Sequence, residues 1–485
     1  MMNSKFVGMP CDYCRWGTYR EPDNGQEWHV TCDDCKAIHI CYEPLPHQAR
    51  FHADPTKYRM FAGGYGSGKT TTACMETIDH ILSTPNGATL IGAETFPQLE
   101  ATAMKEFFAI FPEELIESHN KQKNVLITKN GHTVFFRPLD DEQKARSLNL
   151  TFFWIEEANG VPYEYFVQLQ TRLRNHATKH HRGILSTNPD MNWVKTEFLL
   201  KSKNIYNSDI EYQQNLDNIN PNYSTHIAPT HLNTYLPPTY FEDTAQGKPE
   251  WWIRRYLEAS FENKEGLVFP MYADHIVPSF DVPAHWQRRI GGDFGLNNPT
   301  GFLALATDPQ TAITYVYMEH REAMQPVSYH AEVLNGWLDK LPYGVLVDMI
   351  GDAAGQQRSN VDLASVFDHY QEYGIYWTPS TKKLEDSIIK LYSYFSTGNL
   401  KIMDNCVELI AELQEYRYPE RKIGDTTRNE RYYERPIAQN DHLIDALRYV
   451  VAEMPDDPQM LKNESYNAQF EIVRGTLQAS RLPFA

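Results

Sequence analysis

The stretch Phe61-Ala62-Gly63-Gly64-Tyr65-Gly66-Ser67-Gly68-Lys69-Thr70 decides the fold of this chain. It matches G-x-x-x-x-G-K-[ST], a phosphate-binding loop whose glycines let backbone N–H groups converge on phosphates. We expect a strand over residues 58–62 before the loop and a helix over residues 70–82 after it. Lys69 should reach the β- and γ-phosphates of ATP, and the Thr70 hydroxyl should bind Mg²⁺. The residues expected to surround the nucleotide are Gly63, Gly64, Tyr65, Gly66, Ser67, Gly68, Lys69 and Thr70.

Length and composition limit the class of protein. The 485 residues are enough for about three domains. With 41% hydrophobic and 22% charged residues, the composition is that of a soluble globular protein. No apolar run approaches the ~20 residues of a membrane span, and no signal pattern opens the chain, so we expect a cytosolic protein. The net charge of −18 argues against a surface that coats DNA generally, but permits a local basic groove.

A second nucleotide-site element lies at Thr151-Phe152-Phe153-Trp154-Ile155-Glu156-Glu157, an apolar strand that ends in two carboxylates. This is the form of a Walker B element. Glu156 is expected to hold Mg²⁺, and Glu157 to polarise the water that attacks the γ-phosphorus. Two acids after a strand are common on surfaces, so the assignment depends on their position downstream of Lys69.

Three further residues are candidates for contacts with the nucleotide. Asn188 ends a predicted strand at the small polar sequence Ser-Thr-Asn, which can sense the γ-phosphate. Gln48 precedes the loop at a distance where many P-loop motors place a glutamine that reads adenine. Arg146 precedes the two acids on a loop that could reach the nucleotide of a neighbouring subunit. For Gln48 and Arg146, a solvated surface role is equally compatible with the sequence.

The N-terminus carries two C-x-x-C pairs, Cys11 with Cys14 and Cys32 with Cys35. Their separation fits a tetrahedral Zn²⁺ site in a small ribbon, with thiolates as soft ligands. Two disulfides or a redox pair are the alternatives, and a cytosolic location disfavours the disulfides. Cys41 is a spare possible ligand. A closed site of four thiolates has no open position for a substrate, so its role should be structural or adhesive.

The part of the chain from residue 286 onward contains three acidic segments in order. Asp293 ends a strand before a glycine turn and a returning strand, which is how RNase H-like nucleases present their first metal ligand. Asp352 ends a second strand. Asp441 and Asp445 lie four residues apart, on one face of a predicted helix. Carboxylates that converge from separate elements form a hard-oxygen site for two Mg²⁺ or Mn²⁺ ions, which would support phosphodiester cleavage.

Residues 417–435 concentrate basic and aromatic side chains between the second and third acidic segments. We interpret them as a hairpin with a DNA-facing side; four acids in the segment leave a salt-bridged surface hairpin as the alternative. Residues beyond 455 form a polar tail. The basic and aromatic residues are Arg417, Tyr418, Arg421, Lys422, Arg428, Arg431, Tyr432, Tyr433 and Arg435.

The order of these motifs resembles the large terminase subunit of tailed bacteriophages over residues 46–455. The sequence Asp441-His442-Leu443-Ile444-Asp445-Ala446-Leu447-Arg448-Tyr449 is its most specific part. The resemblance implies a RecA/ASCE-like P-loop ATPase domain (46–214), a lid or linker (215–285), an RNase H-like nuclease domain (286–455) and a tail (456–485). A zinc ribbon (1–45) would precede them; it is not a general terminase feature, so its role is not inherited.

By this resemblance, Lys69, Thr70, Glu156 and Glu157 are ATPase residues and Arg146 is a trans-acting arginine finger. Asp293, Asp352 and Asp445 would bind the nuclease metals, with Asp441 and His442 as close alternates. The Glu-Glu pair departs from the usual Asp-Glu. The implied partners are double-stranded DNA, the portal protein of the procapsid and a small terminase subunit. The chain would be a monomer in solution and a pentameric ring on the portal, in the host cytoplasm rather than in the mature virion.

Two other functions remain for comparison. A DNA-repair helicase-nuclease that uses ATP would need a second RecA-like domain, and residues 190–285 are too few for one. A binding scaffold with a degenerate ATPase would be expected to lack Lys69 or Glu157, and both are present.

Overall fold

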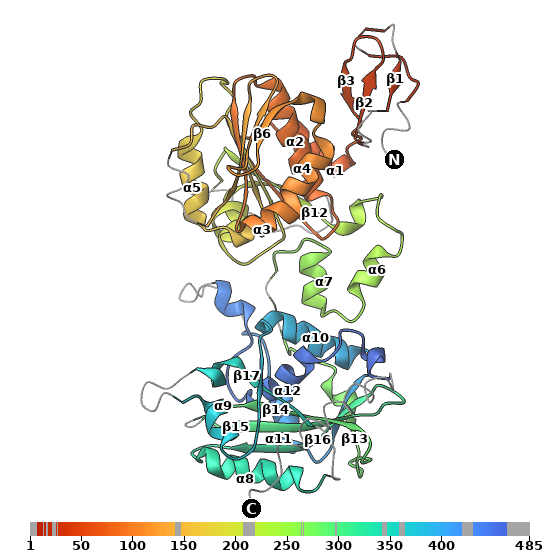
Figure 1. Ribbon diagram of the computed structural model, residues 1–485, viewed down its shortest axis with the longest axis vertical. Helices are drawn as coiled ribbons and strands as arrows, with labels where there is room; N and C mark the ends of the chain where they lie inside the picture. Colours follow the sequence, from red (N-terminus) through yellow and green to blue (C-terminus); the bar gives the residue numbers. More distant parts are fainter. Residues whose placement is uncertain are drawn as a thin grey trace, which may run out of the picture. The chain divides into compact units, whose positions relative to one another are not determined.

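The computed structural model separates into two compact units, residues 1–245 with 250–263 and residues 246–249 with 264–485. Each unit is described below by itself. The described residues are 7–462 without 13, 16–17, 22–25, 27, 141–146, 207–218, 263, 265, 296–297, 342–346, 358–363 and 420–429. Figure 1 shows the chain coloured along its sequence.

A small antiparallel sheet opens the first unit. Its strands are β1 (Tyr19–Arg20), β2 (His29–Cys32) and β3 (Ile38–Ile40), paired in the order β1-β2-β3. Its interior is too small for a large apolar core and instead contains Cys11, Cys32 and Val30. This ribbon is attached to the larger part of the unit: Gln26 Nε2 donates hydrogen bonds to the carbonyls of Phe108 and Phe111 at 3.2 and 3.1 Å.

The larger sheet of the first unit has nine strands in the order β11-β12-β4-β10-β9-β5-β8-β7-β6. From β11 to β8 in this spatial order, each strand is parallel to its neighbour. Strand β7 pairs antiparallel with both β8 and β6. The bounds are β4 (Tyr58–Gly63), β5 (Ala88–Ala93), β6 (Ile116–Asn120), β7 (Val125–Thr128), β8 (Thr133–Pro138), β9 (Phe152–Glu156), β10 (Arg182–Thr187), β11 (Lys203–Tyr206) and β12 (Tyr223–Ala228).

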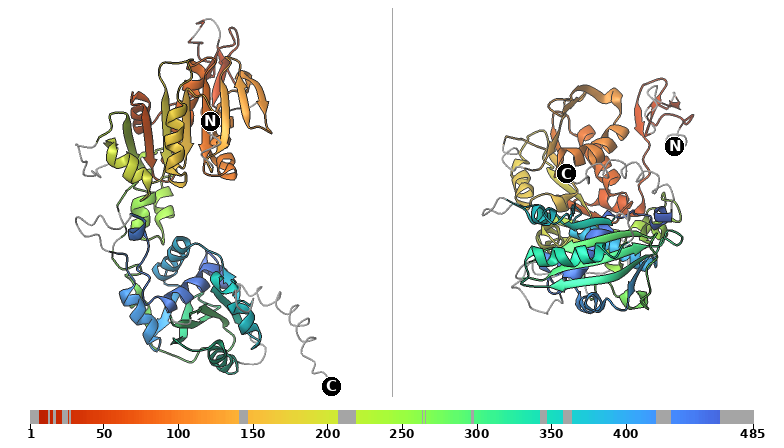
Figure 2. Two further views of the ribbon diagram at one scale, coloured as in Figure 1. Left: turned by 90° about the vertical axis from the view of Figure 1, so that its left-hand side faces the viewer. Right: turned by 60° about the horizontal axis from the view of Figure 1, so that its bottom comes forward.

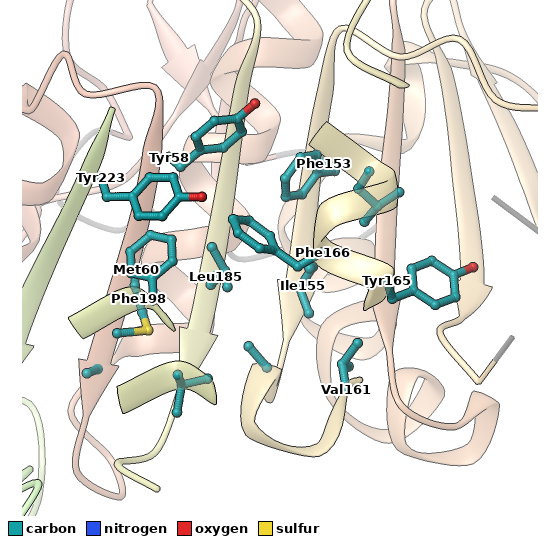
Figure 3. Packing of buried hydrophobic residues seen from close by; sticks show 14 of the residues in the cluster. Tyr58, Met60, Phe153, Ile155, Val161, Tyr165, Phe166, Leu185, Phe198 and Tyr223 are labelled. Carbon is teal, nitrogen blue, oxygen red and sulfur yellow. The ribbon is translucent and has the colours of Figure 1, made fainter. Parts of the chain in front are cut away.

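Helices cover both faces of this sheet because its central strands are apolar on both sides, as expected for a parallel sheet. Helices α2 (Lys69–Ser83) and α4 (Lys105–Ile110) pack on one face, and α5 (Tyr163–Arg172) packs on the other (Figure 1). Figure 3 shows the α5 side, where residues of β4, β9 and β10 meet aromatic side chains of α5 and of residues 198 and 223. The remaining helices are α1 (Pro46–Ala53), α3 (Phe96–Leu99), α6 (Tyr240–Ala245) and α7 (Glu250–Tyr256).

The structure corrects one domain boundary expected from the sequence. Strand β12 lies in the segment 215–285 that was expected to be a lid or linker, yet it pairs in parallel with the P-loop strand β4. Its six residues are all buried. The ATPase-type domain therefore continues beyond residue 214, and residues 250–263 also belong to the first unit.

The second unit is built on a mixed seven-stranded sheet in the order β13-β19-β16-β15-β14-β17-β18. β14 is antiparallel to β15 and parallel to β17, so the carboxyl ends of β14 and β17 lie at the same edge. The bounds are β13 (Ile276–Val277), β14 (Gln287–Asp293), β15 (Thr300–Thr307), β16 (Thr314–Glu322), β17 (Val347–Asp352), β18 (Thr378–Ser380) and β19 (Leu400–Met403).

Helices again cover both faces of the sheet. Helices α8 (Val327–Leu338) and α9 (Val366–Gln371) enclose an apolar core with β14, β15 and β17. On the opposite face, α12 (His442–Glu453) crosses β14, β15 and β17 and packs beside α10 (Leu384–Ser396) and α11 (Val407–Glu415) (Figures 1 and 2). Gly291 makes this approach possible, since a Cβ there would lie 2.3 Å from the carbonyl of Ala446.

Across the described ranges of both units, no helix combines the length and the apolarity that crossing a bilayer requires.

Candidate ATPase, nuclease and metal sites

The phosphate-binding loop joins the carboxyl end of β4 to the first turn of α2. Gly66 (φ +71°) and Gly68 (φ +84°) adopt left-handed backbone conformations that strongly favour glycine. They turn the loop so that α2 begins at Lys69, and the positive end of the helix faces the place where phosphates bind in such loops. The strand and helix expected around the motif are both present.

The two residues expected to hold Mg²⁺ lie together. The Thr70 hydroxyl donates to Glu156 Oε1 at 2.7 Å, and the Ser186 hydroxyl donates to the other carboxylate oxygen, Oε2. Burial, with the nearby charge of Glu157, raises the pKa of Glu156 above its usual range. A buried carboxylate beside a hydroxyl is a set of hard oxygen donors whose charge a divalent cation would offset, so these residues fit Mg²⁺.

Glu157 lies beside the lysine of the loop. Its Oε1 is 3.9 Å from Lys69 Nζ, and its Oε2 accepts a hydrogen bond from Asn188 Nδ2 at 3.3 Å. The backbone of Glu157 is left-handed (φ +48°), which is uncommon for a residue with a side chain and frequent at functional sites. The parallel register of β9 and β10 pairs Glu156 with Ser186, so the Ser-Thr-Asn tip lies next to the two acids.

Gln48 is buried rather than on the surface. Its Oε1 accepts a hydrogen bond from the Leu45 amide at 2.8 Å, and its Nε2 donates to the carbonyl of Gly68 at 3.3 Å. Next to it, His47 Nε2 lies 3.1 Å from the carbonyl of Ser67. Helix α1 therefore contacts the end of the phosphate-binding loop through the carbonyls of Ser67 and Gly68. A role of Gln48 in reading adenine stays a prediction.

Sequence reasoning missed a set of contacts on the other side of the loop. Thr230 Oγ1 donates to the carbonyl of Tyr65 at 2.7 Å, and Asn233 Nδ2 donates to that of Gly66 at 2.6 Å. The Tyr65 ring stacks on Tyr256 with centroids 5.1 Å apart. These partners come from the segment expected to be a lid, and nothing in their local sequence marks them.

The first two acids of the candidate nuclease site end neighbouring parallel strands. Gly292 pairs with Gly351, so Asp293 and Asp352 each occupy the next position, at the carboxyl edge of β14 and β17. Asp352 Oδ1 also accepts a hydrogen bond from the Ala354 amide at 3.1 Å, which caps a short 3₁₀ turn. The strand pairing therefore brings together two acids that lie far apart in the sequence.

Helix α12 brings the third acidic segment to this edge. His442 Nδ1 lies 2.8 Å from Asp293 Oδ2, which links the helix to β14 directly. Burial raises the pKa of Asp445 to about 6; Arg448 opposes this, while Asp293 and Asp441 add to it. Burial also raises the pKa of Asp441, and the charge of Asp293 contributes. The acids therefore share one electrostatic environment.

The carboxylates fit divalent cations by chemistry, because half-buried acids that repel one another offer the hard oxygens that Mg²⁺ and Mn²⁺ prefer. They are less tightly gathered than the thiols below: in the described part of the chain, only the four cysteines form a group with all ligand atoms within 4.8 Å of one another. Asp445 Oδ1 is shared with Arg448, at 3.1 Å from Nε and 3.0 Å from a terminal nitrogen.

The four predicted thiolates converge in the ribbon. Cys11 and Cys35 have their Sγ atoms 3.7 Å apart, as do Cys14 and Cys32, and none of these four cysteines is in a disulfide. The arrangement fits a tetrahedral Zn²⁺ site, as the spacing indicated. Cys41 is buried but lies outside the group.

Two further predictions concern Arg146 and the basic and aromatic segment 417–435. Arg146 lies outside the described residues, as do Arg421, Lys422 and Arg428, so the hairpin is not described. The side chains of Tyr418 and Tyr433 are 1% and 2% exposed, which contradicts a DNA-facing position for them, since rings in the core cannot stack on bases. Arg417 and Arg435 are exposed.

Comparisons with known proteins agree on one family. The phage terminase large subunit family matches residues 55–250. The PBSX phage terminase large subunit of Bacillus subtilis (strain 168) is 27% identical over 308 residues, which are 58% of this chain and 68% of that protein. The large terminase subunit of Escherichia phage T5 is 28% identical over 209 residues, 41% of this chain and 44% of the relative.

Solved structures agree on the fold. The large terminase of a thermophilic bacteriophage superposes with a TM-score of 0.62 over 84% of this chain and 98% of its own, at 17% identity. The complex of the same terminase with ADP superposes with a TM-score of 0.60, over 85% of this chain and 99% of that terminase. The fold and the sites define a P-loop ATPase-type domain joined to a nuclease-type domain. The family match over residues 55–250, the two curated relatives and the shared fold all indicate a phage large terminase subunit.

Proposed function

We propose that this chain hydrolyses ATP to move double-stranded DNA into a viral procapsid, and that its second unit cuts concatemeric DNA with a two-metal endonuclease centre. The observation that supports the proposal most is the presence of two separate acidic centres in one chain. One lies beside the Lys69 loop, at Glu156 and Glu157, and the other lies at the β14–β17 edge, beside α12.

In the ATPase site, each side chain has a task that its position suggests. Backbone amides of the loop and Lys69 bind the phosphates, and Thr70 with Glu156 would hold Mg²⁺. A γ-phosphate would draw Lys69 away from Glu157. The released carboxylate would then accept a hydrogen bond from the attacking water and orient it, while Asn188 keeps Glu157 in place.

In the nuclease site, Asp293, Asp352 and Asp445 would hold the metal ions, with Asp441 as the alternate third acid. Bound Mg²⁺ or Mn²⁺ ions supply a water of lowered pKa and stabilise the charge of the leaving oxygen. The protein's own part is to gather the carboxylates: the β14–β17 pairing fixes two of them, and the His442 contact with Asp293 fixes the helix that carries the others.

Packaging requires partners that the family resemblance implies. We propose a ring, a pentamer by the resemblance, on the portal protein of the procapsid, with a small terminase subunit that selects DNA, acting in the host cytoplasm. Arg146 would reach the nucleotide of the neighbouring subunit. The exposed Arg417 and Arg435 would contact DNA phosphates, so that cutting would weaken with salt and show little sequence preference.

A packaging assay tests the whole proposal. Empty procapsids, the small subunit, DNA, ATP and Mg²⁺ are mixed with the full chain, and DNA protected from external nuclease is measured. We expect protection that depends on ATP and is lost with Lys69→Ala. Protection without ATP, or its persistence in Lys69→Ala, would refute the motor role. For cutting, Asp445→Asn and Asp441→Asn are compared in Mn²⁺-dependent plasmid nicking, and the variant that abolishes nicking identifies the third ligand.

A further inference from the structure

The first turn of α12 is capped by a side chain from another helix. Glu412 of α11 is 3% exposed, and its Oε2 accepts hydrogen bonds from the amides of Leu443 at 2.8 Å and Ile444 at 3.0 Å. These are the second and third residues of α12, whose amides have no partner within the helix. Accepting such amides is the usual task of the residue that precedes a helix.

The residue that precedes α12 is Asp441, one of the best helix-capping residue types, yet its side chain makes no capping hydrogen bond. Its backbone (φ −123°, ψ 13°) lies outside the extended region that capping residues usually adopt. The preceding Asn440 is left-handed at φ +52°. The chain therefore enters α12 in a conformation that does not direct the Asp441 carboxylate back to the helix amides.

Glu412 is itself held in place from β16. Arg321 Nε lies 3.2 Å from Glu412 Oε1, and a terminal nitrogen of Arg321 donates to Asn440 Oδ1 at 3.4 Å. Glu319 accepts hydrogen bonds from the amides of Glu408 and Leu409, both at 2.9 Å, and so caps α11 in the same way. Two buried or half-buried acids thus fix two successive helices, and the second helix carries the acids of the nuclease site.

We propose that Glu412 is a positioning residue of the nuclease centre: it caps α12 in place of Asp441, and so leaves the Asp441 carboxylate to face Asp293 and the metal ions. Without Glu412, Asp441 would turn back to the amides of its own helix, and the centre would lose an acid. The inference rests on the proposed nuclease function and adds to it a residue that touches neither metal nor DNA.

The experiment uses the full chain with Glu412→Met, which keeps the size but removes the acceptor, and Glu412→Gln, which keeps an acceptor oxygen. Mn²⁺ binding is measured by calorimetry. The Mn²⁺ binding that the natural chain shows and the Asp293→Ala variant lacks is assigned to the nuclease centre, and is the component compared below. We expect Glu412→Met to weaken that component about 10–100-fold, the usual effect of removing a partner that orients a ligand. Glu412→Gln should stay within about threefold, since the amides keep their acceptor.

Hydrogen exchange supplies a readout independent of metal. The Leu443 and Ile444 amides should exchange faster in Glu412→Met than in Glu412→Gln, without added metal. Ser365→Ala is the matched control, because it removes the cap of α9 in the same unit, where Ser365 Oγ accepts from the Asp368 amide at 3.1 Å. Ser365→Ala should leave Mn²⁺ binding unchanged. If Ser365→Ala weakened Mn²⁺ binding as much as Glu412→Met does, a specific role for Glu412 would be overturned.

A double-mutant cycle tests the link to Asp441. If Glu412 acts by freeing Asp441, the loss of Mn²⁺ binding in Glu412→Met should largely disappear in the Asp441→Ala background. Additive losses would overturn the proposed link, and a Glu412→Gln variant as weak as Glu412→Met would overturn capping as the cause. Absence of any Mn²⁺ component that Asp293→Ala removes would instead refute the nuclease centre itself.

Discussion

At the scale of single residues, the proposed ATPase site depends on the different partners of two adjacent glutamates. Glu156 is buried and bonded to Thr70 and Ser186, whereas Glu157 faces Lys69 and Asn188. The division arises because β9 ends between them: Glu156 keeps the strand conformation, and Glu157 turns into the left-handed region. Glu156 and Glu157 are adjacent in sequence, but their carboxylates therefore have different surroundings and different proposed roles.

Glu157→Gln should bind ATP as the natural chain does and hydrolyse it about 10²–10⁴-fold more slowly, because an amide cannot accept the proton of the attacking water. Phosphate release measures the turnover, and a fluorescent ATP analogue measures the binding. Glu164→Gln, the same change at an exposed position of α5, is the control. Turnover of Glu157→Gln within a few-fold of the natural chain would assign the role to another residue.

At the scale of elements, a buried charge network joins α2 to β4 and α1. Glu76 of α2 forms an ion pair with Arg59 of β4 and is hydrogen-bonded to His52 of α1, with 2.7 Å between Glu76 Oε2 and His52 Nδ1. Burial by itself would raise the pKa of Glu76, but the hydrogen bond from His52 and the charge of Arg59 outweigh it and lower the pKa to about 2. The ionised form is therefore favoured by the fold.

This lowered pKa predicts a pH-dependent contribution to stability. It is fully present above the ordinary pKa of 4.5 and is lost as the pH falls towards 2. Glu76→Gln should therefore destabilise the first unit by about 3 kcal/mol near pH 7, and the difference should shrink below about pH 4.5. Hydrogen exchange of β4 and α2 peptides reports on this unit alone. The exposed Glu100→Gln is the control, and a difference that stays constant with pH would contradict the assignment.

The ribbon should contain about one Zn²⁺ per chain, since folding of so small an apolar core depends on the metal. We expect Cys14→Ser and Cys35→Ser to lose the metal, as measured by elemental analysis. Cys41→Ser is the matched control, because this nearby thiol lies outside the group of four. Chelation should unfold residues 1–45 and spare the ATPase core; full zinc content after loss of Cys14 would refute the site.

At the scale of the whole molecule, each activity should belong to one unit. The Lys69 loop lies in the first unit, and Asp293 lies in the second. Lys69→Ala should abolish ATP hydrolysis and keep Mn²⁺-dependent nicking of plasmid. Asp293→Ala should do the reverse, because removal of a ligand empties at least one metal position. Loss of both activities in either variant would show that the two sites depend on each other.

The sequence by itself determined the motifs that are contained in one strand, loop and helix. The glycines and Lys69 of the phosphate-binding loop, the two acids at the end of β9 and the cysteine pairs of the ribbon are local patterns, because phosphate and metal chemistry requires fixed residue types at short spacings. The order of these motifs also indicated the family and both fold classes. These predictions needed no knowledge of which strands pair.

Only the tertiary structure decided what depends on pairing between distant segments. β12 joined the ATPase sheet although polar residues precede it, because its buried face completes the sheet beside β4. Tyr418 and Tyr433 turned out to be core residues, since an aromatic ring near basic residues looks the same in sequence whether it packs inside or faces DNA. Glu412 reads as one more acid on an amphipathic helix. Its partners lie about 30 residues away, and only the packing of α11 on α12 brings it to the first turn that it caps.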